Sequence, residues 1–403
     1  MIRRKQELMC QLLIDQQMTG ELHDINLMEA KDSIQKSKVK WAIEGDENSK
    51  FFHGLINKKR SQLAIRGVFV DGLWRTDPGM VKEAFFNHFE ARFKKPVTHR
   101  LKLNFLFVKR LSQVQAAHLE RCVSRDEIRL AVWNCGENKS PGPDGYMFEF
   151  FRTYWNFVGP DFCEAVEYFF ENGSFPKGCN SSFVALIPKV TDAKFVNNFR
   201  PISLIGCVYK VVTKVLANRL ALVISDLVSD TQSAFVARRQ ILDGPFILNE
   251  ILHWCKRKKK QAMFFKVDFA KAYDSVRWDY LLNVLEAFGF GQIWCKWVRG
   301  TFSSAKASVL VNGSPCVCVS FHRGLKQGDP LSPYLFILIM ESLHMYFLRA
   351  VDDGFFKDSS DKKITWAAWD KVLASKNHGG LGVSSFHALN SALFLKWVWR
   401  FVS

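Results

Sequence analysis

Asp268 is the residue best placed for metal chemistry. It is an acid near the end of the apolar stretch 262–269 (AMFFKVDF), which predicts a buried strand. A carboxylate at the end of such a strand is held firmly, and carboxylate oxygens are ligands that Mg²⁺ accepts. Asp268 is therefore a candidate metal ligand. The simpler alternative is that Asp268 caps the N-terminus of the helix that follows.

Two basic residues flank a predicted hairpin. Lys189 follows the short apolar strand 183–187 (FVALI) and Pro188, and Arg200 lies within residues 198–204 (NFRPISL). Both side-chain types bind phosphate groups, and a guanidinium can grip two oxygens at once. The pair is a candidate phosphate site, and a solvated hairpin without a ligand is the alternative.

A glycine-rich loop at residues 323–333 (RGLKQGDPLSP) precedes a strongly apolar segment. Glycine allows backbone to approach a ligand closely. Ser332-Pro333 is typical of a helix start, so a buried helix is expected at 334–350. A chance loop-to-helix turn is the alternative to a binding loop.

The rest of the sequence indicates alternating helices and short strands. Asp71-Gly72 predicts a hairpin within 67–74, and Asn312-Gly313 predicts another within 307–321. Residues 1–45 are charged and favour an exposed helix. Further helices are expected at 77–93, 126–136, 147–157, 160–172, 206–228, 240–257 and 276–289.

Composition narrows the class of protein. The chain has 403 residues, 48% of them hydrophobic, which is enough for a sizeable core and disfavours bulk disorder. The net charge of +17 favours a polyanionic partner over an inert basic surface. None of the ten Cys forms a C-x-x-C pair, so no zinc-finger spacing exists. The N-terminus is too polar for a signal peptide and no membrane span is expected, which predicts an intracellular protein of nucleus or cytoplasm.

These motifs share a chain order with one family. Residues 267–274 (VDFAKAYD) resemble a polymerase palm strand, and residues 323–333 resemble its Q-G-x-x-x-S-P box. Residues 139–145 (KSPGPDG) and 232–235 (QSAF) look like fingers motifs. Over roughly residues 36–357 the chain resembles the reverse transcriptase of a non-LTR (LINE-type) retroelement of plant type.

The resemblance assigns roles near the predicted strand. Asp268 would be the catalytic carboxylate that binds Mg²⁺, and the carbonyl of Phe269 would be a further metal ligand. Tyr273 would crowd the sugar 2′-hydroxyl and favour deoxynucleotides. The implied reaction is RNA-directed DNA synthesis, with an RNA template, a DNA primer or target and deoxynucleoside triphosphates as partners.

The resemblance also assigns the nucleotide and template sites. Residues implied to bind the incoming nucleotide, besides Tyr273, are Lys189, Arg200, Gln327 and Gly328. Residues implied to seat the template and primer are Gly324, Pro330, Ser332 and Pro333.

The implied fold class is α+β, with the fingers and palm of a right-hand polymerase. The palm would be built on a ferredoxin-like split βαβ unit. The expected domains are a helical linker region at 1–100, fingers and a partial palm at 101–357, and a remnant of a post-polymerase region at 358–403. The thumb would be absent and the palm incomplete.

One expected motif is missing. Such a polymerase carries a second acidic motif, Tyr-x-Asp-Asp, and none of the eight Tyr begins one. The only Asp-Asp, Asp352-Asp353, directly follows the apolar helix and precedes Gly354. Two metals about 3.5–4 Å apart need carboxylates from both motifs. This copy is therefore expected to be catalytically defective, and a non-enzymatic, basic nucleic-acid-binding remnant is the alternative function.

Overall fold

The computed structural model describes residues 61, 64–96, 103–136, 139–230, 232–239, 243–259 and 269–352. The described elements belong to one compact unit, Ile65–Ser359. The predicted helix at 1–45, most of the strand at 262–269 and Asp268 itself lie outside the described residues. The split βαβ palm and the expected domain boundaries stay predictions.

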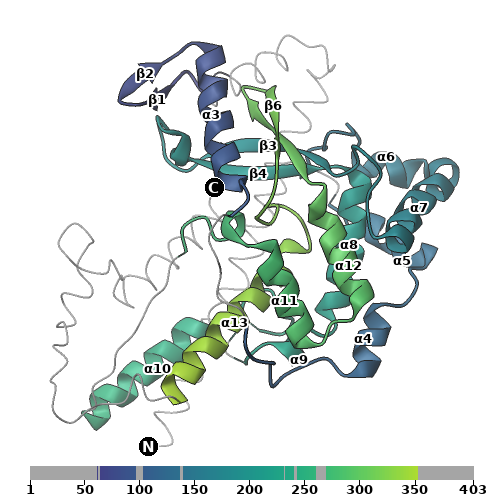
Figure 1. The fold of residues 1–403 in the computed structure, drawn as a ribbon, viewed down its shortest axis with the longest axis vertical. Coiled ribbons are helices and arrows are strands. Elements are labelled where there is room, and N and C mark those ends of the chain that lie inside the picture. Colours follow the sequence, from purple (N-terminus) through teal and green to yellow (C-terminus); the bar gives the residue numbers. More distant parts are fainter. Residues whose placement is uncertain are drawn as a thin grey trace, which may run out of the picture. The chain divides into compact units, whose positions relative to one another are not determined.

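Four strands form the main sheet, in the order β4-β3-β5-β6 (Figure 1). The strands are β3 (Ser181–Pro188), β4 (Phe199–Ile205), β5 (Lys306–Val311) and β6 (Ser314–Ser320). The hairpin pairs β3–β4 and β5–β6 are antiparallel, whereas β3 and β5 run parallel. Two hairpins from distant parts of the sequence thus join side by side in one mixed sheet.

One core lies between this sheet and helix α3 (Pro78–Phe93), which packs along β6. Phe85, Phe89 and Phe93 are buried on one side of α3, at the four-residue spacing of a helix face. They meet alternate residues of β5, including Val309, which is 1% exposed. The small hairpin β1 (Val68–Val70) and β2 (Leu73–Arg75) adjoins α3.

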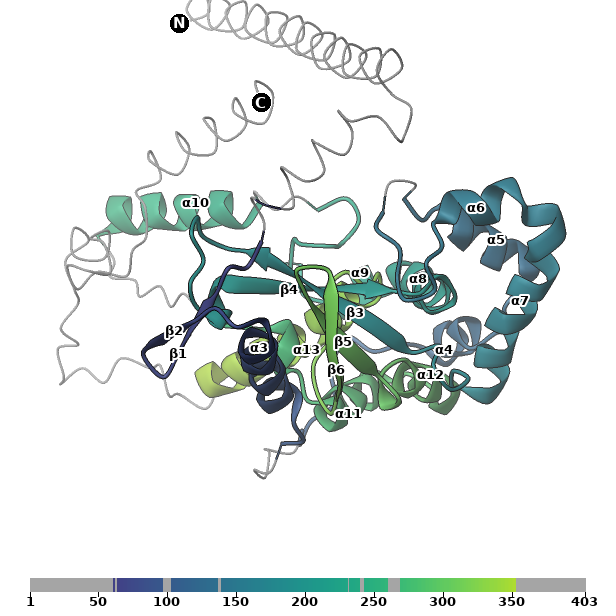
Figure 2. The same ribbon diagram turned by 90° about the horizontal axis from the view of Figure 1, so that it is seen from above.

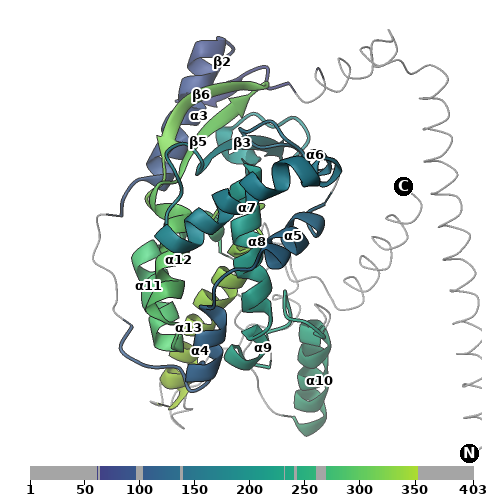
Figure 3. The same cartoon turned by 90° about the vertical axis from the view of Figure 1, so that its right-hand side faces the viewer.

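A second, larger core is helical. Figure 2 shows α5, α6 and α7 grouped beside α8, and Figure 3 shows α11, α12 and α13 side by side. The remaining described elements are α4 (Gln113–Leu119), α5 (Arg125–Trp133), α6 (Phe148–Thr153), α7 (Trp155–Asn172), the 3-10 turn η1 (Val196–Asn198), α8 (Cys207–Ala221), α9 (Ile224–Leu227), α10 (Asp243–Lys258), the 3-10 turn η2 (Tyr273–Ser275), α11 (Trp278–Phe288), α12 (Gln292–Ser303) and α13 (Ser332–Asp352).

Local signals in the sequence located several boundaries correctly. Asp71-Gly72 and Asn312-Gly313 both turn their hairpins through positive φ angles, which the expected turn type requires. The Asp77 carboxylate accepts a hydrogen bond from the Met80 amide at 2.9 Å and caps α3. Both hairpins and the helix start are therefore confirmed.

Three helix predictions were wrong in detail. Helix α7 begins at Trp155 and continues through Pro160, where a break was expected. Buried neighbours such as Phe162 hold this turn despite the missing donor, because packing overrides local propensity. The expected helix 206–228 is divided into α8 and α9, and neither α4 nor α12 was anticipated.

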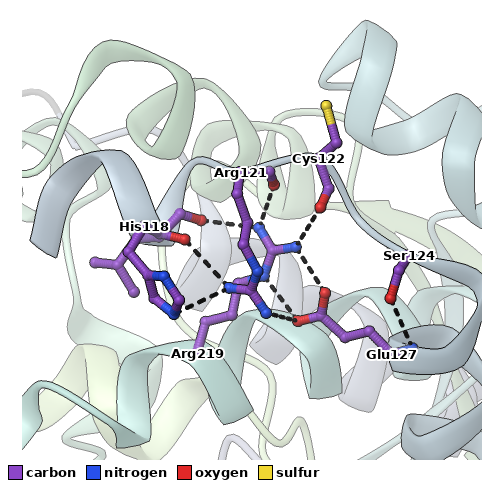
Figure 4. A network of polar contacts seen from close by, with 7 residues as sticks. His118, Arg121, Cys122, Ser124, Glu127 and Arg219 are labelled. Atoms are coloured by element: carbon purple, nitrogen blue, oxygen red, sulfur yellow. Dashed lines mark hydrogen bonds and ion pairs between the residues drawn. The ribbon is translucent and has the colours of Figure 1, made fainter. Parts of the chain in front are cut away.

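A buried arginine ties the helical core together. Arg219 of α8 is 1% exposed, and its guanidinium donates to both carboxylate oxygens of Glu127 at 2.8 Å (Figure 4). It also donates to the carbonyls of Leu119, Arg121 and Cys122. Burial raises the pKa of Glu127, but the hydrogen bond and charge of Arg219 outweigh it, so the pKa is lowered overall.

We expect Arg219→Met to lower the free energy of unfolding by about 3–5 kcal/mol, because it leaves three backbone carbonyls without this donor and the largely buried Glu127 with only the more exposed Arg121 as a cationic partner. Urea unfolding of the full chain measures the loss. The matched control is Arg125→Met, since Arg125 pairs with Glu167 at the surface and its loss should change stability little. Equal losses in the two variants would contradict this account.

Candidate functional site

A cleft of about 510 Å³ lies between the β3–β4 hairpin, the turn η2 and the loop before α13. Most of the residues predicted to bind nucleotide or template line this cleft. They are Lys189, Arg200, Tyr273, Gln327, Gly328, Pro330, Ser332 and Pro333. The structure thus brings together segments that lie up to 144 positions apart in the sequence, from Lys189 to Pro333.

The β3–β4 hairpin presents the two basic residues. Arg200 pairs with Ile187 in the sheet register, so it lies opposite the end of β3. The backbone amide of Lys189 donates to the carbonyl of Asn198 at 2.8 Å, and its Nζ donates to the carbonyl of Asn197 at 3.0 Å. Both basic side chains are exposed. They are therefore accessible to an anion in the cleft.

Tyr273 forms part of the opposite wall. Its ring stacks on Phe336 of α13, with centroids 4.9 Å apart and an interplanar angle of 16°. Burial raises the pKa of the Tyr273 hydroxyl, which therefore stays protonated at neutral pH. The stacking fixes the ring as a bulky wall, which is what a role in sugar selection requires.

The glycine-rich loop forms the floor of the cleft. Gly328 has a φ of +102°, a conformation that side chains rarely adopt, and it lies against the carbonyl of Ser203. The amide of Ser203 donates to the carbonyl of Gln327 at 2.8 Å, and the amide of Leu325 donates to the carbonyl of Tyr273 at 2.9 Å. Strand β4 and the turn η2 thus hold the loop from both sides.

Asp274 and Arg92 form a buried ion pair at the edge of the cleft, which the sequence analysis missed. Arg92 Nη1 lies 3.0 Å from Asp274 Oδ2, and the two side chains are 9% and 5% exposed. Gln327 Nε2 donates to the other carboxylate oxygen at 3.4 Å. Burial raises the pKa of Asp274, with Arg92 and Gln327 opposing the rise.

Backbone carbonyls at the end of α3 also attach this helix to the start of the glycine-rich loop. Arg323 Nε donates to the carbonyl of Arg92 at 2.6 Å, and the amide of His322 donates to the carbonyl of Phe93 at 3.0 Å. Arg92 lies 182 positions before Asp274. No local pattern in the sequence links residues so far apart, although the acid of the DFAKAYD segment was visible.

A buried carboxylate supports the end of the loop. Asp329 accepts hydrogen bonds from the amide of Leu331 at 3.0 Å, Ser332 Oγ at 3.3 Å and Tyr209 Oη at 3.2 Å. Burial raises the pKa of Asp329, and the hydrogen bonds oppose that rise. Ser332 is only 1% exposed, so it both lines the cleft and anchors the start of α13.

Of the predicted site residues that the structure describes, two are not on the cleft wall, Phe269 and Gly324. Asp268 lies outside the described residues. Phe269 is 46% exposed and lines a separate, mainly apolar groove of about 420 Å³ beside α13. Gly324 is buried behind the cleft, where its φ of +93° and its contact with the Asp274 backbone leave little room for a side chain.

The described residues do not form a metal centre by themselves. Among them, no group of three or more His, Cys, Asp and Glu is placed to hold a metal ion. Asp274 is neutralised by Arg92, and Asp329 is already surrounded by three donors. The residues that line the cleft therefore fit an anionic ligand better than a metal ion.

Within the part of the chain that the structure describes, no helix is long and apolar enough to span a bilayer.

Comparison with known proteins identifies the class. Residues 187–367 match the family described as reverse transcriptase (RNA-dependent DNA polymerase). The chain is 29% identical over 361 residues to the transposon TX1 uncharacterized 149 kDa protein of Xenopus laevis, covering 88% of this chain and 28% of that protein.

Two Pol polyproteins give the same result. The chain is 26% identical over 274 residues to the retrovirus-related Pol polyprotein from type-1 retrotransposable element R2 of Nasonia vitripennis, covering 68% of this chain and 26% of that protein. It is 28% identical over 233 residues to the retrovirus-related Pol polyprotein from type-2 retrotransposable element R2DM of Drosophila melanogaster, covering 58% of this chain and 21% of that protein. This chain therefore carries a reverse transcriptase domain of the non-LTR retrotransposon type, and it spans about a quarter of the length of these relatives.

We expect Arg92→Met to lower the free energy of unfolding by about 3–5 kcal/mol, because Asp274 would stay buried without its partner. Arg92→Lys should lose less, since it keeps the charge but not the planar guanidinium. Chemical denaturation of the full chain compares the two variants. Indistinguishable stability of Arg92→Met and the parent would show that the ion pair does not hold α3 to the loop.

Proposed function

We propose that the cleft binds a deoxynucleoside triphosphate. Lys189 and Arg200 would take the phosphates, because both are exposed cations on a firmly paired hairpin. Tyr273 would lie against the sugar, and residues 327–333 would lie beneath the base pair with the template. One observation carries this proposal: the basic hairpin, the stacked Tyr273 and the glycine-rich loop all line the same cleft.

The family reaction is RNA-directed DNA synthesis, and we propose it as the ancestral activity of this chain. An RNA template and a DNA primer or target would be the partners, and the net charge of +17 supports binding to both backbones. Reverse transcriptases use a divalent metal, usually Mg²⁺. Asp268 and the carbonyl of Phe269 remain the proposed ligands of this metal.

The chain's own residues would contribute binding and orientation. Lys189 and Arg200 would offset the charge of the triphosphate, and the stacked ring of Tyr273 would leave little space for a 2′-hydroxyl. Gly328 would let the loop approach the base pair without a side chain in the way. These interactions hold a nucleotide in place but do not by themselves transfer a phosphoryl group.

We further propose that this copy is catalytically defective. Its sequence has no Tyr-x-Asp-Asp motif, and the Asp352 of its only Asp-Asp ends α13 instead of lying on a strand. The proposed present-day function is therefore nucleotide and nucleic-acid binding.

Nucleotide binding by the full chain tests the cleft. We expect Lys189→Ala and Arg200→Ala each to weaken binding of dTTP by about tenfold or more, since each removes one charge-assisted contact. Calorimetry at fixed salt gives the affinities, and Lys177→Ala is the control because exposed Lys177 does not line the cleft. Binding that is unchanged in both cleft variants would remove the proposed phosphate site.

Primer extension on an RNA template with Mg²⁺ tests the activity. We expect no extension above that of an Asp268→Ala control, because a two-metal centre needs further carboxylates. Extension that Asp268→Ala abolishes would show that the copy is active and would make Asp352-Asp353 the next residues to change. Salt-dependent RNA binding without extension would support the binding function.

A further inference from the structure

Lys271 is a basic residue of the cleft to which the sequence analysis gave no role. It lies just before η2, on the opposite side of the cleft from the β3–β4 hairpin, and its side chain is exposed. Lys189 and Arg200 lie on the hairpin side. A ligand between the two sides would therefore meet cations from both of them.

One residue, Asn197 of η1, links the two lysines. Lys271 Nζ lies 3.4 Å from the side-chain oxygen of Asn197, whereas Lys189 Nζ donates to the backbone carbonyl of Asn197 at 3.0 Å. Neither lysine forms a salt bridge with a carboxylate of the described residues. A neutral amide is a weak partner for two ammonium groups, so an anion would bind both more strongly.

The backbone at Lys271 is strained. Its φ is +58°, in the left-handed region that is unfavourable for a residue with a side chain relative to the right-handed form. Glycine would adopt this conformation without that cost. A lysine at this position therefore keeps its side chain in the cleft at the expense of backbone stability, a pattern typical of functional positions.

The charge balance of the cleft supports an anion. Among the described residues, four cations line it, Arg92, Lys189, Arg200 and Lys271, against the carboxylates of Asp274 and Asp329. Asp274 is already paired with Arg92. Burial, together with the positive charges of Arg92, Lys271 and Lys189, also lowers the pKa of nearby His88 to about 4. These cations thus create a common positive field.

We propose that Lys271 is a third phosphate-binding residue of the cleft, which exchanges its bond to Asn197 for an oxygen of a polyphosphate. The ligand class is a triphosphate, bound between the β3–β4 hairpin and the turn at 271. The inference rests on the proposed function, because it names a further residue of the same site. Its consequence is that triphosphate binding bridges the hairpin and this turn, which in its absence are linked by the Asn197 amide.

Lys271→Gly separates binding from folding, because it removes the cation and relieves the strained backbone. We expect this variant to bind tripolyphosphate and dTTP about tenfold more weakly than the parent, with an unchanged or higher melting temperature. Lys271→Arg should stay within about threefold of the parent, since it keeps the charge. Calorimetry with the full chain gives the affinities, and Lys177→Gly, at another exposed lysine, is the matched control.

Each outcome decides one point. Equal weakening of tripolyphosphate and dTTP binding in Lys271→Gly supports the proposal. Weakening confined to a single-stranded oligonucleotide would show that Lys271 contacts nucleic-acid backbone and would overturn it. Unchanged triphosphate binding in Lys271→Gly, beside weaker binding in Lys189→Ala, would reject this inference alone. Absence of triphosphate binding by the parent chain would reject the proposed function itself.

Asn197→Ala tests whether Lys271 exchanges its bond to Asn197 for a phosphate oxygen. It removes the side-chain oxygen that Lys271 must leave but keeps the backbone carbonyl that holds Lys189. We expect the triphosphate affinity to equal that of the parent or to be up to about threefold tighter, since Lys271 then has no hydrogen bond to Asn197 to break before it binds the ligand. Clearly weaker binding would mean that Asn197 contacts the ligand itself, which contradicts its role as the exchanged partner.

Discussion

The buried carboxylate of Asp329 is the constraint on which the cleft depends. Three donors converge on it from Tyr209 of α8, from the backbone at Leu331 and from Ser332 at the start of α13. A buried carboxylate is costly unless such donors surround it, so the segments that supply them are held together. Beside it, burial lowers the pKa of the Lys326 ammonium to about 7, while Asp329 opposes the shift.

The same network continues behind the loop. Lys326 Nζ donates to Asn180 Oδ1 at 2.6 Å and lies 3.9 Å from the centroid of the Tyr209 ring. Asn180 in turn donates to the carbonyl of Thr301 in α12. Trp278 packs against both cores, and its indole Nε1 donates to the carbonyl of Gly324 at 2.8 Å. The two cores are thereby joined at the loop. A cleft with a rigid floor follows from these contacts.

The sequence analysis correctly predicted several turns and helix starts that neighbouring residues determine. The Asp-Gly and Asn-Gly hairpins, the Asp77 cap and the Ser332-Pro333 helix start each depend on neighbouring residues, and each was found. The family match and the gathering of Lys189 and Arg200 with the glycine-rich loop around one cleft agree with the motif order in the chain.

Helix α12 was missed because it depends on distant contacts, whereas α4 was missed although Ser112 and Gln115 form a local capping box. Helix α12 begins after Gly291 without a capping side chain and contains Gly300, so its sequence gives no clear start signal. Gly300 is required there because a side chain would collide with the carbonyl of Gly173, 127 positions away in the chain. Arg92 was missed for the same reason, since burial opposite Asp274 is a property of the folded chain alone.

The position of α3 has a consequence for how this protein can be inherited. The helix lies before residue 187, where the family match begins, yet it covers one face of the sheet and supplies the cation that neutralises Asp274. A recombination event that transferred the matched segment alone would leave an exposed apolar sheet and an unpaired buried acid. The segment that must stay together for the sheet to fold is therefore longer than residues 187–367, which the family match delimits.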